Sequence, residues 1–239
     1  MRNRALVWLE SLFAFLFPAR CRCCGEELGW TRYRYICEGC WSEVKPVPRP
    51  VCRICGRPGA SICRDCVLDR PPFDKARSAL LYEGAVETAI HLLKFERKRV
   101  MGRFLAELLI EWAPLEEFED AELVVPMPLS KKRLAERGFN QVDPLAEAVS
   151  GEMGLPLRKD VLLKGRETPP QSLFQGREER ISNVRGAFEV GNAEAVRGRI
   201  VLLVDDVFTT GATASEAAGE LLRAGAAKVY ILTLARAGV

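Results

Sequence analysis

The stretch VLLVDDVFTTGAT, residues 201–213, constrains the fold of this 239-residue chain more than any other feature. Its four leading apolar residues predict a strand buried on both faces, as in a parallel sheet covered by helices. Alanines and leucines at helical spacing follow from Ala214 to Leu222, and Gly225 then supplies a stop. The motif therefore lies on a strand–loop–helix turn, the place where open α/β sheets bind their ligands.

The segment after Pro71-Pro72 alternates strand-like and helix-like patterns. The expected strands are 79–82, 123–126, 188–190, 200–204 and 228–234, and the expected helices are 85–94, 104–112 and 142–153. We expect Pro144 to interrupt the last helix early. Such alternation predicts an open parallel sheet with right-handed crossovers, in an α/β domain spanning 71–239.

The chemistry of the motif follows from its residue types. We expect the chain to leave the strand at Asp205 and Asp206, because adjacent strand side chains point to opposite faces and both acids must reach one ligand. Backbone amides, the Thr209 and Thr210 hydroxyls and the positive end of the next helix can cradle a phosphate, and Gly211 allows a close approach. The carboxylates repel phosphate but suit sugar hydroxyls or hydrated Mg²⁺. A phosphorylated sugar fits both requirements.

Eight of the nine cysteines form four C-x-x-C pairs, a spacing typical of zinc ligands. Pairing in chain order predicts two Cys₄ sites, and pairing the first C-x-x-C with the third is an open alternative. The predicted ligands are Cys21, Cys24, Cys37, Cys40, Cys52, Cys55, Cys63 and Cys66, with Cys23 left over. A disulfide framework is disfavoured because no credible export signal is present. We expect one or two structural Zn²⁺ in a module at 21–70, in a cytoplasmic protein.

The N-terminal part is basic and carries a short apolar segment. Residues 1–100 contain 18 Lys and Arg against 11 Asp and Glu, a net of +7, which suits a polyanionic partner or simply a solvated basic surface. We expect an amphipathic helix within residues 1–20. The apolar run at 12–17 predicts no transmembrane segment, because it is far shorter than the ~20 residues that a membrane span needs.

VLLVDDVFTTGAT resembles the phosphoribosyl-diphosphate (PRPP) motif of type I phosphoribosyltransferases. Further stretches make the chain similar to the ComF family of competence-associated proteins over nearly its whole length. They are HLLKFERK (91–98), VPMPLSKKRLAERGFNQ (125–141), KGRETPPQSLFQGREERISNVRGAF (164–188) and the cysteine pairs. The resemblance implies a type I phosphoribosyltransferase fold, an open parallel sheet flanked by helices, preceded by the zinc-binding module.

The resemblance also implies roles for individual residues. Asp205 and Asp206 would hold the ribose hydroxyls, directly or through Mg²⁺. The residues implied to bind PRPP are Thr209, Thr210, Gly211, Ala212 and Thr213 at the 5-phosphate, and Leu129, Ser130 and Lys131 in the pyrophosphate loop, with Arg133 and Arg137 nearby. Residues 164–183 would form a mobile loop whose cations are Arg166, Arg177 and Arg180. Lys131 and these loop arginines have a simpler interpretation as solvated surface.

Three functions are compatible with this pattern. The resemblance implies Mg²⁺-dependent displacement of pyrophosphate from ribose C1 by a nitrogen nucleophile that the sequence does not identify, in a protein of DNA uptake and natural transformation. The second is non-catalytic binding of single-stranded DNA, in which Tyr33, Tyr35 and Trp41 of the basic ribbons stack on bases. Packing of these aromatics around zinc is the alternative. The third is an adaptor that docks onto helicase-like or DNA-processing competence proteins.

Overall fold

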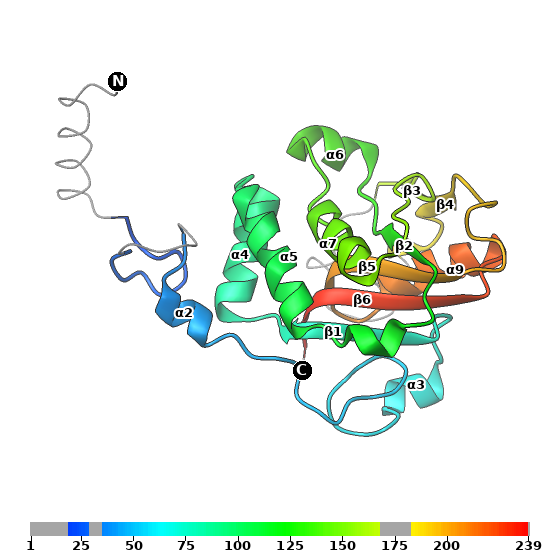
Figure 1. The fold of residues 1–239 in the computed structure, drawn as a ribbon, viewed down its shortest axis with the longest axis horizontal. Helices are drawn as coiled ribbons and strands as arrows, with labels where there is room; N and C mark the ends of the chain where they lie inside the picture. Colours follow the sequence, from blue (N-terminus) through cyan, green and yellow to red (C-terminus); the bar gives the residue numbers. More distant parts are fainter. Residues whose placement is uncertain (1–18, 29–34, 168–182, 239) are drawn as a thin grey trace.

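A four-stranded parallel sheet organises the chain (Figure 1). The computed structural model describes residues 19–28, 35–167 and 183–238. The strands are β1 (Lys75–Leu81), β2 (Leu123–Pro126), β5 (Ile200–Phe208) and β6 (Lys228–Arg236), in the order β1-β6-β5-β2. All neighbouring pairs are parallel, and a small antiparallel pair, β3 (Leu162–Lys164) and β4 (Phe188–Val190), lies apart from them. The predicted α/β class is confirmed.

Helices cover both faces of this sheet. Helices α4 (Gly84–Phe95), α5 (Val100–Trp112) and α7 (Asp143–Met153) lie on one face, and α9 (Ala212–Arg223) packs against β6 and β4 on the other. Shorter helices are α2 (Glu38–Ser42), α3 (Arg64–Leu68), α6 (Lys131–Arg137) and the 3-10 turn η1 (Leu115–Phe118). Pro144 does not interrupt α7. It lies in the first helical turn, where proline removes no hydrogen bond.

Three strands are longer than the apolar runs predict. Strand β1 starts at Lys75 rather than 79, β5 continues through the two acids to Phe208, and β6 ends at Arg236 rather than 234. The expectation that the chain leaves the strand at Asp205 and Asp206 is therefore wrong. The reason lies in β6, which extends to Arg236 and stays paired with β5 up to Phe208. The two carboxylates must then point to opposite faces of the sheet.

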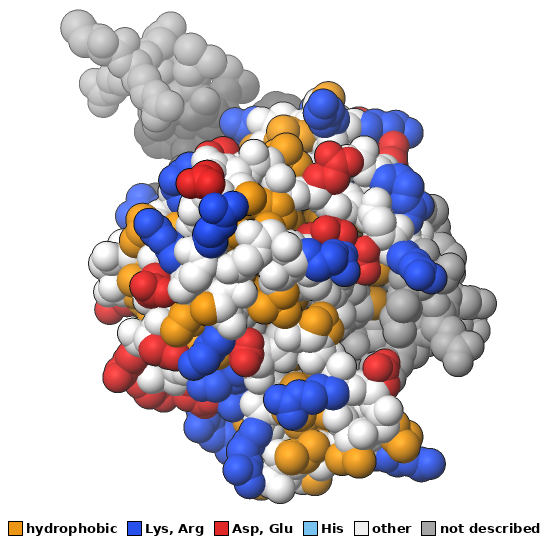
Figure 2. Space-filling view, turned by 90° about the vertical axis from the view of Figure 1, so that its right-hand side faces the viewer, with side chains coloured by type: hydrophobic (Ala, Val, Ile, Leu, Met, Phe, Trp, Pro, Cys, Tyr) orange, Lys and Arg blue, Asp and Glu red, His pale blue; other side chains and the backbone are white. Residues whose placement is uncertain are grey.

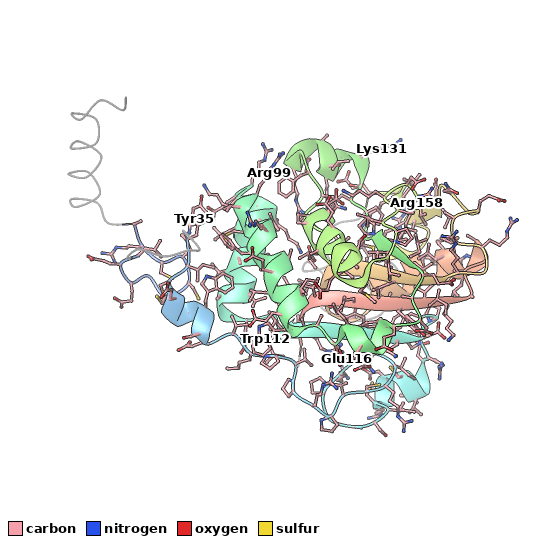
Figure 3. The ribbon with its side chains drawn as sticks, in the orientation of Figure 1. Tyr35, Arg99, Trp112, Glu116, Lys131 and Arg158 are labelled. Atoms are coloured by element: carbon pink, nitrogen blue, oxygen red, sulfur yellow. The ribbon has the colours of Figure 1, made fainter. Side chains whose placement is uncertain are left out.

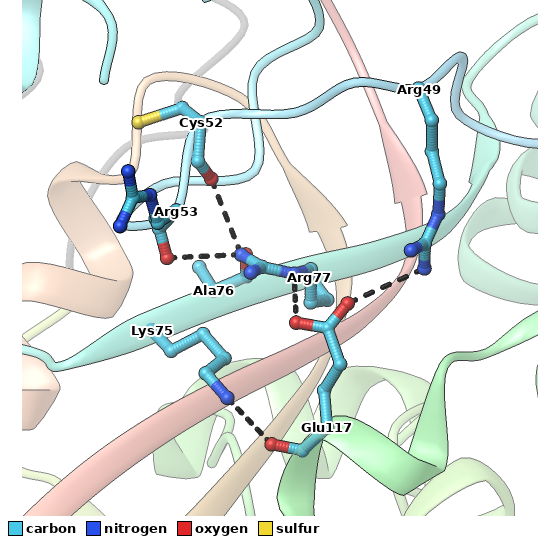
Figure 4. A network of polar contacts seen from close by, with 7 residues as sticks. All are labelled: Arg49, Cys52, Arg53, Lys75, Ala76, Arg77 and Glu117. Carbon is cyan, nitrogen blue, oxygen red and sulfur yellow. Dashed lines mark hydrogen bonds and ion pairs between the residues drawn. The ribbon is translucent and has the colours of Figure 1, made fainter. Parts of the chain in front are cut away.

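The cysteine pairs form two ribbons that attach to this domain differently. We call residues 21–40 ribbon 1 and residues 52–66 ribbon 2. Ribbon 2 lies beside β1, where the Arg77 guanidinium donates to the carbonyls of Cys52 and Arg53 and pairs with Glu117 (Figure 4). Ribbon 1 meets the end of α4 through an ion pair between the partly exposed side chains of Arg22 and Glu96.

The surface has no single dominant charge on the face drawn in Figure 2, where acidic and basic side chains alternate. Hydrophobic side chains appear at its lower end, over ribbon 2 and α3; Ile62, Val67 and Leu68 are exposed there. Within the described ranges, no helix has the length and apolarity needed to span a bilayer. The expected N-terminal helix lies outside the described residues except at 19–20, so the boundaries 1–20, 21–70 and 71–239 stay a prediction.

Candidate functional site

The eight paired cysteines come together in two groups of four. Within each group the Sγ atoms lie within 4.8 Å of one another, and the groups follow chain order, so the cross-braced pairing does not occur. The Sγ–Sγ distances are 3.9 Å for Cys21–Cys40 and 3.6 Å for Cys55–Cys63. A tetrahedral zinc with Zn–S bonds of ~2.3 Å requires sulfurs about 3.8 Å apart, so both groups fit Zn²⁺. Cys23 belongs to neither group.

One large cleft of about 1140 Å³ opens at the carboxyl ends of the strands. It contains Asp205, Asp206 and the loop that follows them, and it extends as far as ribbon 2. The cations on its wall are Arg57, Lys94, Arg97, Lys132, Arg133, Arg137, Lys164 and Arg236. A single space thus joins two carboxylates to many cations, as a ligand with both hydroxyl and phosphate groups requires.

Asp206 points toward the face covered by α4 and α7. Its carboxylate accepts hydrogen bonds from Lys94 Nζ at 2.8 Å and from Gln141 Nε2 at 2.9 Å. Arg137 donates to the Gln141 side-chain oxygen at 2.6 Å and so orients its amide. The side chains of Lys94 and Asp206 are only 20% and 10% exposed, so this ion pair is largely removed from solvent.

Asp205 points toward the opposite side, near Lys164 at the end of β3. Burial raises the pKa of Asp205 and the charge of Asp206 raises it further, whereas Lys94 and Lys164 oppose the shift. Burial likewise lowers the pKa of Lys164 to about 8, with a contribution from Arg133. The pKa values of Asp205 and Lys164 therefore both lie closer to neutrality than those of free side chains. Such shifts are common at functional sites.

The loop after β5 lies at the start of α9. Thr209, Thr210 and Thr213 line the cleft, and α9 begins at Ala212, so its N-terminal amides and the positive end of its dipole lie at the loop. Gly211 has φ = 81°, and a Cβ atom there would lie 2.7 Å from Phe208 Cζ. Only glycine satisfies both the left-handed backbone and the close contact with the Phe208 ring.

The remaining predicted residues fall in different places. Leu129 lines the cleft, whereas the Ser130 hydroxyl is buried and caps α6 by accepting from Arg133 N. Lys131 starts α6 and is exposed, and the neighbouring Lys132 and Arg133 line the cleft instead.

The cations of the predicted mobile loop are only partly described. Arg166 donates to the carbonyls of Asn183 and Arg185, so it joins the two sides of segment 168–182. Arg177 and Arg180 lie outside the described residues.

Sequence reasoning assigned no role to four residues that the fold brings to the diacid and its loop: Lys94, Gln141, Lys164 and Arg236. Lys94, Gln141 and Lys164 stand inside the motifs HLLKFERK, RGFNQ and KGRETPP. The sequence shows these residues, but it does not show that they lie close to Asp205 and Asp206, because that depends on how the helices and strands pack in three dimensions. Arg236, the last residue of β6, carried no local signal.

Comparison with known proteins agrees with this geometry. A double zinc ribbon domain matches residues 12–67, and a phosphoribosyl transferase domain matches residues 142–239. The chain therefore combines a double zinc ribbon with a phosphoribosyltransferase-type α/β domain.

Three relatives that match most of the chain identify its family within this class. The DNA utilization protein YhgH of Escherichia coli K12 is 30% identical over 226 residues, covering 92% of this chain and 97% of that one. Competence protein ComFC of Bacillus subtilis is 32% identical, covering 84% of each chain, and competence protein F of Haemophilus influenzae is 28% identical. The chain belongs to the ComF family of competence-associated proteins, and its double zinc ribbon is a zinc-binding module.

Proposed function

We propose that the cleft binds PRPP with Mg²⁺ and that the protein is a phosphoribosyltransferase-like component of DNA uptake. The observation that carries this proposal is the arrangement around β5. Two carboxylates lie near its carboxyl end and point to opposite faces of the sheet, yet both line the same cleft, and the threonine loop at the start of α9 follows after Phe208. The loop suits the 5-phosphate, and the acids suit the ribose hydroxyls. Lys132, Arg133 and Lys164 supply positive charge for the diphosphate.

The chemistry that fits this site is displacement at ribose C1. A nitrogen nucleophile forms a bond to C1 while the bond from C1 to the diphosphate oxygen breaks and diphosphate leaves, and the proton of the nucleophile passes to solvent. Bound Mg²⁺ would supply charge neutralisation for the departing diphosphate. The side chains of this protein would contribute by positioning the ribose and by stabilising leaving-group charge. The thiolate zinc ligands suit a reducing compartment, so we place this activity in the cytoplasm.

Titration of Mg·PRPP by calorimetry tests the proposal. We expect the wild type to bind and an Asp205→Asn/Asp206→Asn variant to lose binding by 100-fold or more, on the order of 3 kcal/mol, because both hydroxyl and Mg²⁺ contacts are removed. Asp160→Asn is the control, because Asp160 is exposed and does not line the cleft. Absence of binding to zinc-loaded, folded wild type would contradict the proposal. Where binding occurs, pyrophosphate release in an acceptor screen then distinguishes turnover from sensing.

We infer a second candidate function, binding of single-stranded DNA, from an aromatic edge next to the cleft. This edge consists of three rings that each lie beside a cation: Arg137 is 5.6 Å from the Phe95 centroid, Arg99 is 4.9 Å from that of Phe139, and Lys98 is 5.3 Å from that of Tyr35. Phe95 is 65% exposed and also lines the mouth of the cleft. One exposed ring and two half-buried rings, each beside a cation, combine the stacking faces and positive charge that bind single strands without sequence preference.

The aromatic edge differs from the ribbon surface expected from sequence. Of the three ribbon aromatics, Tyr33 lies outside the described residues and Trp41 is half-buried against the core. Tyr35 is half-buried as well, but it belongs to the edge through Lys98. In Figure 3, Tyr35 and Arg99 lie toward the ribbon 1 side of the molecule, whereas Arg158 lies toward the opposite side, beyond Lys131.

Fluorescence anisotropy with a labelled oligodeoxynucleotide tests the edge. We expect Phe95→Ala/Arg99→Ala to weaken binding about 10-fold, because loss of one stacking ring and one cation removes roughly 1–2 kcal/mol. Arg158→Ala is the matched control and should bind as the wild type does. Affinity should also fall as salt rises. Equal loss in both variants, or binding that ignores salt, would contradict this second function.

A further inference from the structure

Ribbon 2 is held by the α/β domain at four consecutive backbone carbonyls of its first knuckle. Arg77 Nη1 donates to Cys52 O at 3.3 Å and to Arg53 O at 3.2 Å. The backbone amide of Ala76 in β1 donates to Ile54 O at 2.7 Å, and Arg236 Nη1 donates to Cys55 O at 2.7 Å. Cys52, Cys63 and Cys66 are buried, so this zinc site is enclosed by the fold.

Ribbon 1 lacks this attachment among the described residues. Only Cys21 of its four ligands is buried. It contacts the α/β domain through the Arg22–Glu96 pair and the ring contact between Tyr35 and Lys98, both made by side chains, and through α2, which packs beside α4. The two zinc sites therefore differ in how they are attached to the domain that forms the cleft, although the spacing of their ligands is alike.

Of the three residues that donate to the first knuckle of ribbon 2, Arg77, Ala76 and Arg236, Arg236 also contacts the ring that packs against the candidate phosphate loop. Its side chain is 4% exposed, and its Nη2 lies 3.9 Å from Cys55 Sγ, a zinc ligand. On its other side the guanidinium carbon lies 4.8 Å from the centroid of Phe208. Hydrogen bonds to a thiolate ligand stabilise its charge and orient it, so Arg236 supports the metal site from outside the ligand set.

Phe208 carries the contact onward to the phosphate loop. Its ring is buried, meets Phe73 edge-on at 6.1 Å, and leaves no room for a Cβ at Gly211. A continuous chain of contacts therefore runs from Cys55 through Arg236 and Phe208 to Gly211. Because Arg236 and Phe208 are both buried and lie in direct contact, we expect a displacement of Arg236 to shift the Phe208 ring, which lies against Gly211 before α9.

We propose that Arg236 is a positioning residue that couples zinc binding in ribbon 2 to phosphate binding at the 209–213 loop. The coupling rests on the proposed PRPP site. Coupling between two binding sites is reciprocal, so PRPP must strengthen zinc retention by the factor by which zinc strengthens PRPP binding. Ribbon 1, whose contacts do not lead to Phe208, takes no part.

Zinc release from the full-length, zinc-loaded protein to a chromophoric chelator measures this coupling. We expect saturating Mg·PRPP to slow release from ribbon 2 about 10-fold and to leave ribbon 1 unchanged, because a coupling of that size in zinc affinity would act mainly on zinc dissociation. Cys24→Ser and Cys66→Ser, which disable one ribbon each, identify the phase that belongs to each site. Calorimetry on the same samples records PRPP affinity independently.

Three variants test the successive contacts between Cys55, Arg236 and Phe208 separately. In Arg236→Met, zinc should leave ribbon 2 faster and PRPP should no longer slow it. In Phe208→Leu, which keeps the contact of Arg236 with Cys55, release without PRPP should match the wild type but protection by PRPP should be lost. Arg77→Met is the matched control: it opens the same knuckle without touching Phe208, so release should be faster while protection by PRPP remains.

The outcomes distinguish the coupling from the function on which it rests. PRPP binding to the wild type without any effect on zinc release from ribbon 2 overturns the coupling alone. Protection that survives in Arg236→Met does the same. If the wild type binds no Mg·PRPP, the proposed function fails and the coupling fails with it. Should Arg236→Met not fold, Arg236→Lys retains one hydrogen bond and a charge but lacks the planar stacking group, and its protection should be reduced.

Discussion

Lys94→Met is expected to lower the free energy of unfolding by about 2–3 kcal/mol, because it leaves the buried carboxylate of Asp206 without its cation. The Lys94–Asp206 pair is largely enclosed, and of the two side chains seen to donate to that carboxylate in the described part of the chain, Gln141 would remain. The retained hydrogen bond is why we expect less than the full cost of an unpaired buried charge. Urea denaturation at pH 7.5 measures the change.

Two further variants test the cause of this loss. Lys45→Met removes a lysine whose ion pair with Glu83 is mostly exposed, and it should change stability by less than about 0.5 kcal/mol. In an Asp206→Asn background the carboxylate charge is gone, so Lys94→Met should then cost less than about 1 kcal/mol. An equal cost of Lys94→Met in both backgrounds would show that lost packing, not the charge, is responsible.

Asp205→Asn should stabilise the protein at neutral and alkaline pH, by about 1–3 kcal/mol. The pKa of Asp205 is raised in the folded state by burial and by the charge of Asp206, so the folded protein holds its proton to higher pH than the unfolded chain. Stability contributed by the protonated group is fully present below the unfolded pKa of about 3.9 and is lost as pH rises through the folded pKa. Asparagine removes the cost of ionisation, so its advantage should grow with pH.

Thermal unfolding of the wild type and Asp205→Asn between pH 4 and pH 8.5 measures this advantage. The control is Asp160→Asn, because Arg158 and Asn192 lower the pKa of Asp160, so its contribution has the opposite sign and disappears toward acid pH. If Asp205→Asn is less stable than the wild type at pH 8, the carboxylate has a structural role. The expected gain in stability together with lost PRPP binding is the usual exchange between function and stability at a site.

Much of the fold could be predicted from the sequence, because local sequence patterns determine most of its helices and strands. The apolar runs at 123–126 and 201–204 and the alanine-rich helix after Gly211 mark buried elements by composition alone. The cysteine spacing likewise identified the metal ligands, since two thiols on one knuckle must share a metal. What could not be predicted was where an element ends when its end depends on a partner strand, as at Phe208 and Lys75.

The site was predictable only in the part that one continuous segment supplies. Residues 205–213 form such a segment. The sequence predicts that they lie where a ligand binds, and in the structure most of them line the cleft. Lys94, Lys164 and Arg236 come from α4, β3 and β6, so their approach to the diacid depends on crossings that no local pattern encodes. Arg236 is the clearest case, because its partners Cys55 and Phe208 are 181 and 28 positions away in sequence.

The unbroken course of β5 through Asp205 and Asp206 divides the diacid between the two helical layers. Asp206 contacts Lys94 of α4 and Gln141 just before α7, whereas Asp205 lies near Lys164 of β3. Substitutions on one side of the sheet therefore change the contacts of the acid on that side and reach the other acid only through charge, as Lys94 does with Asp205. Under the proposed function, altering one side would weaken the transfer step while contacts from the other side still bind the ligand.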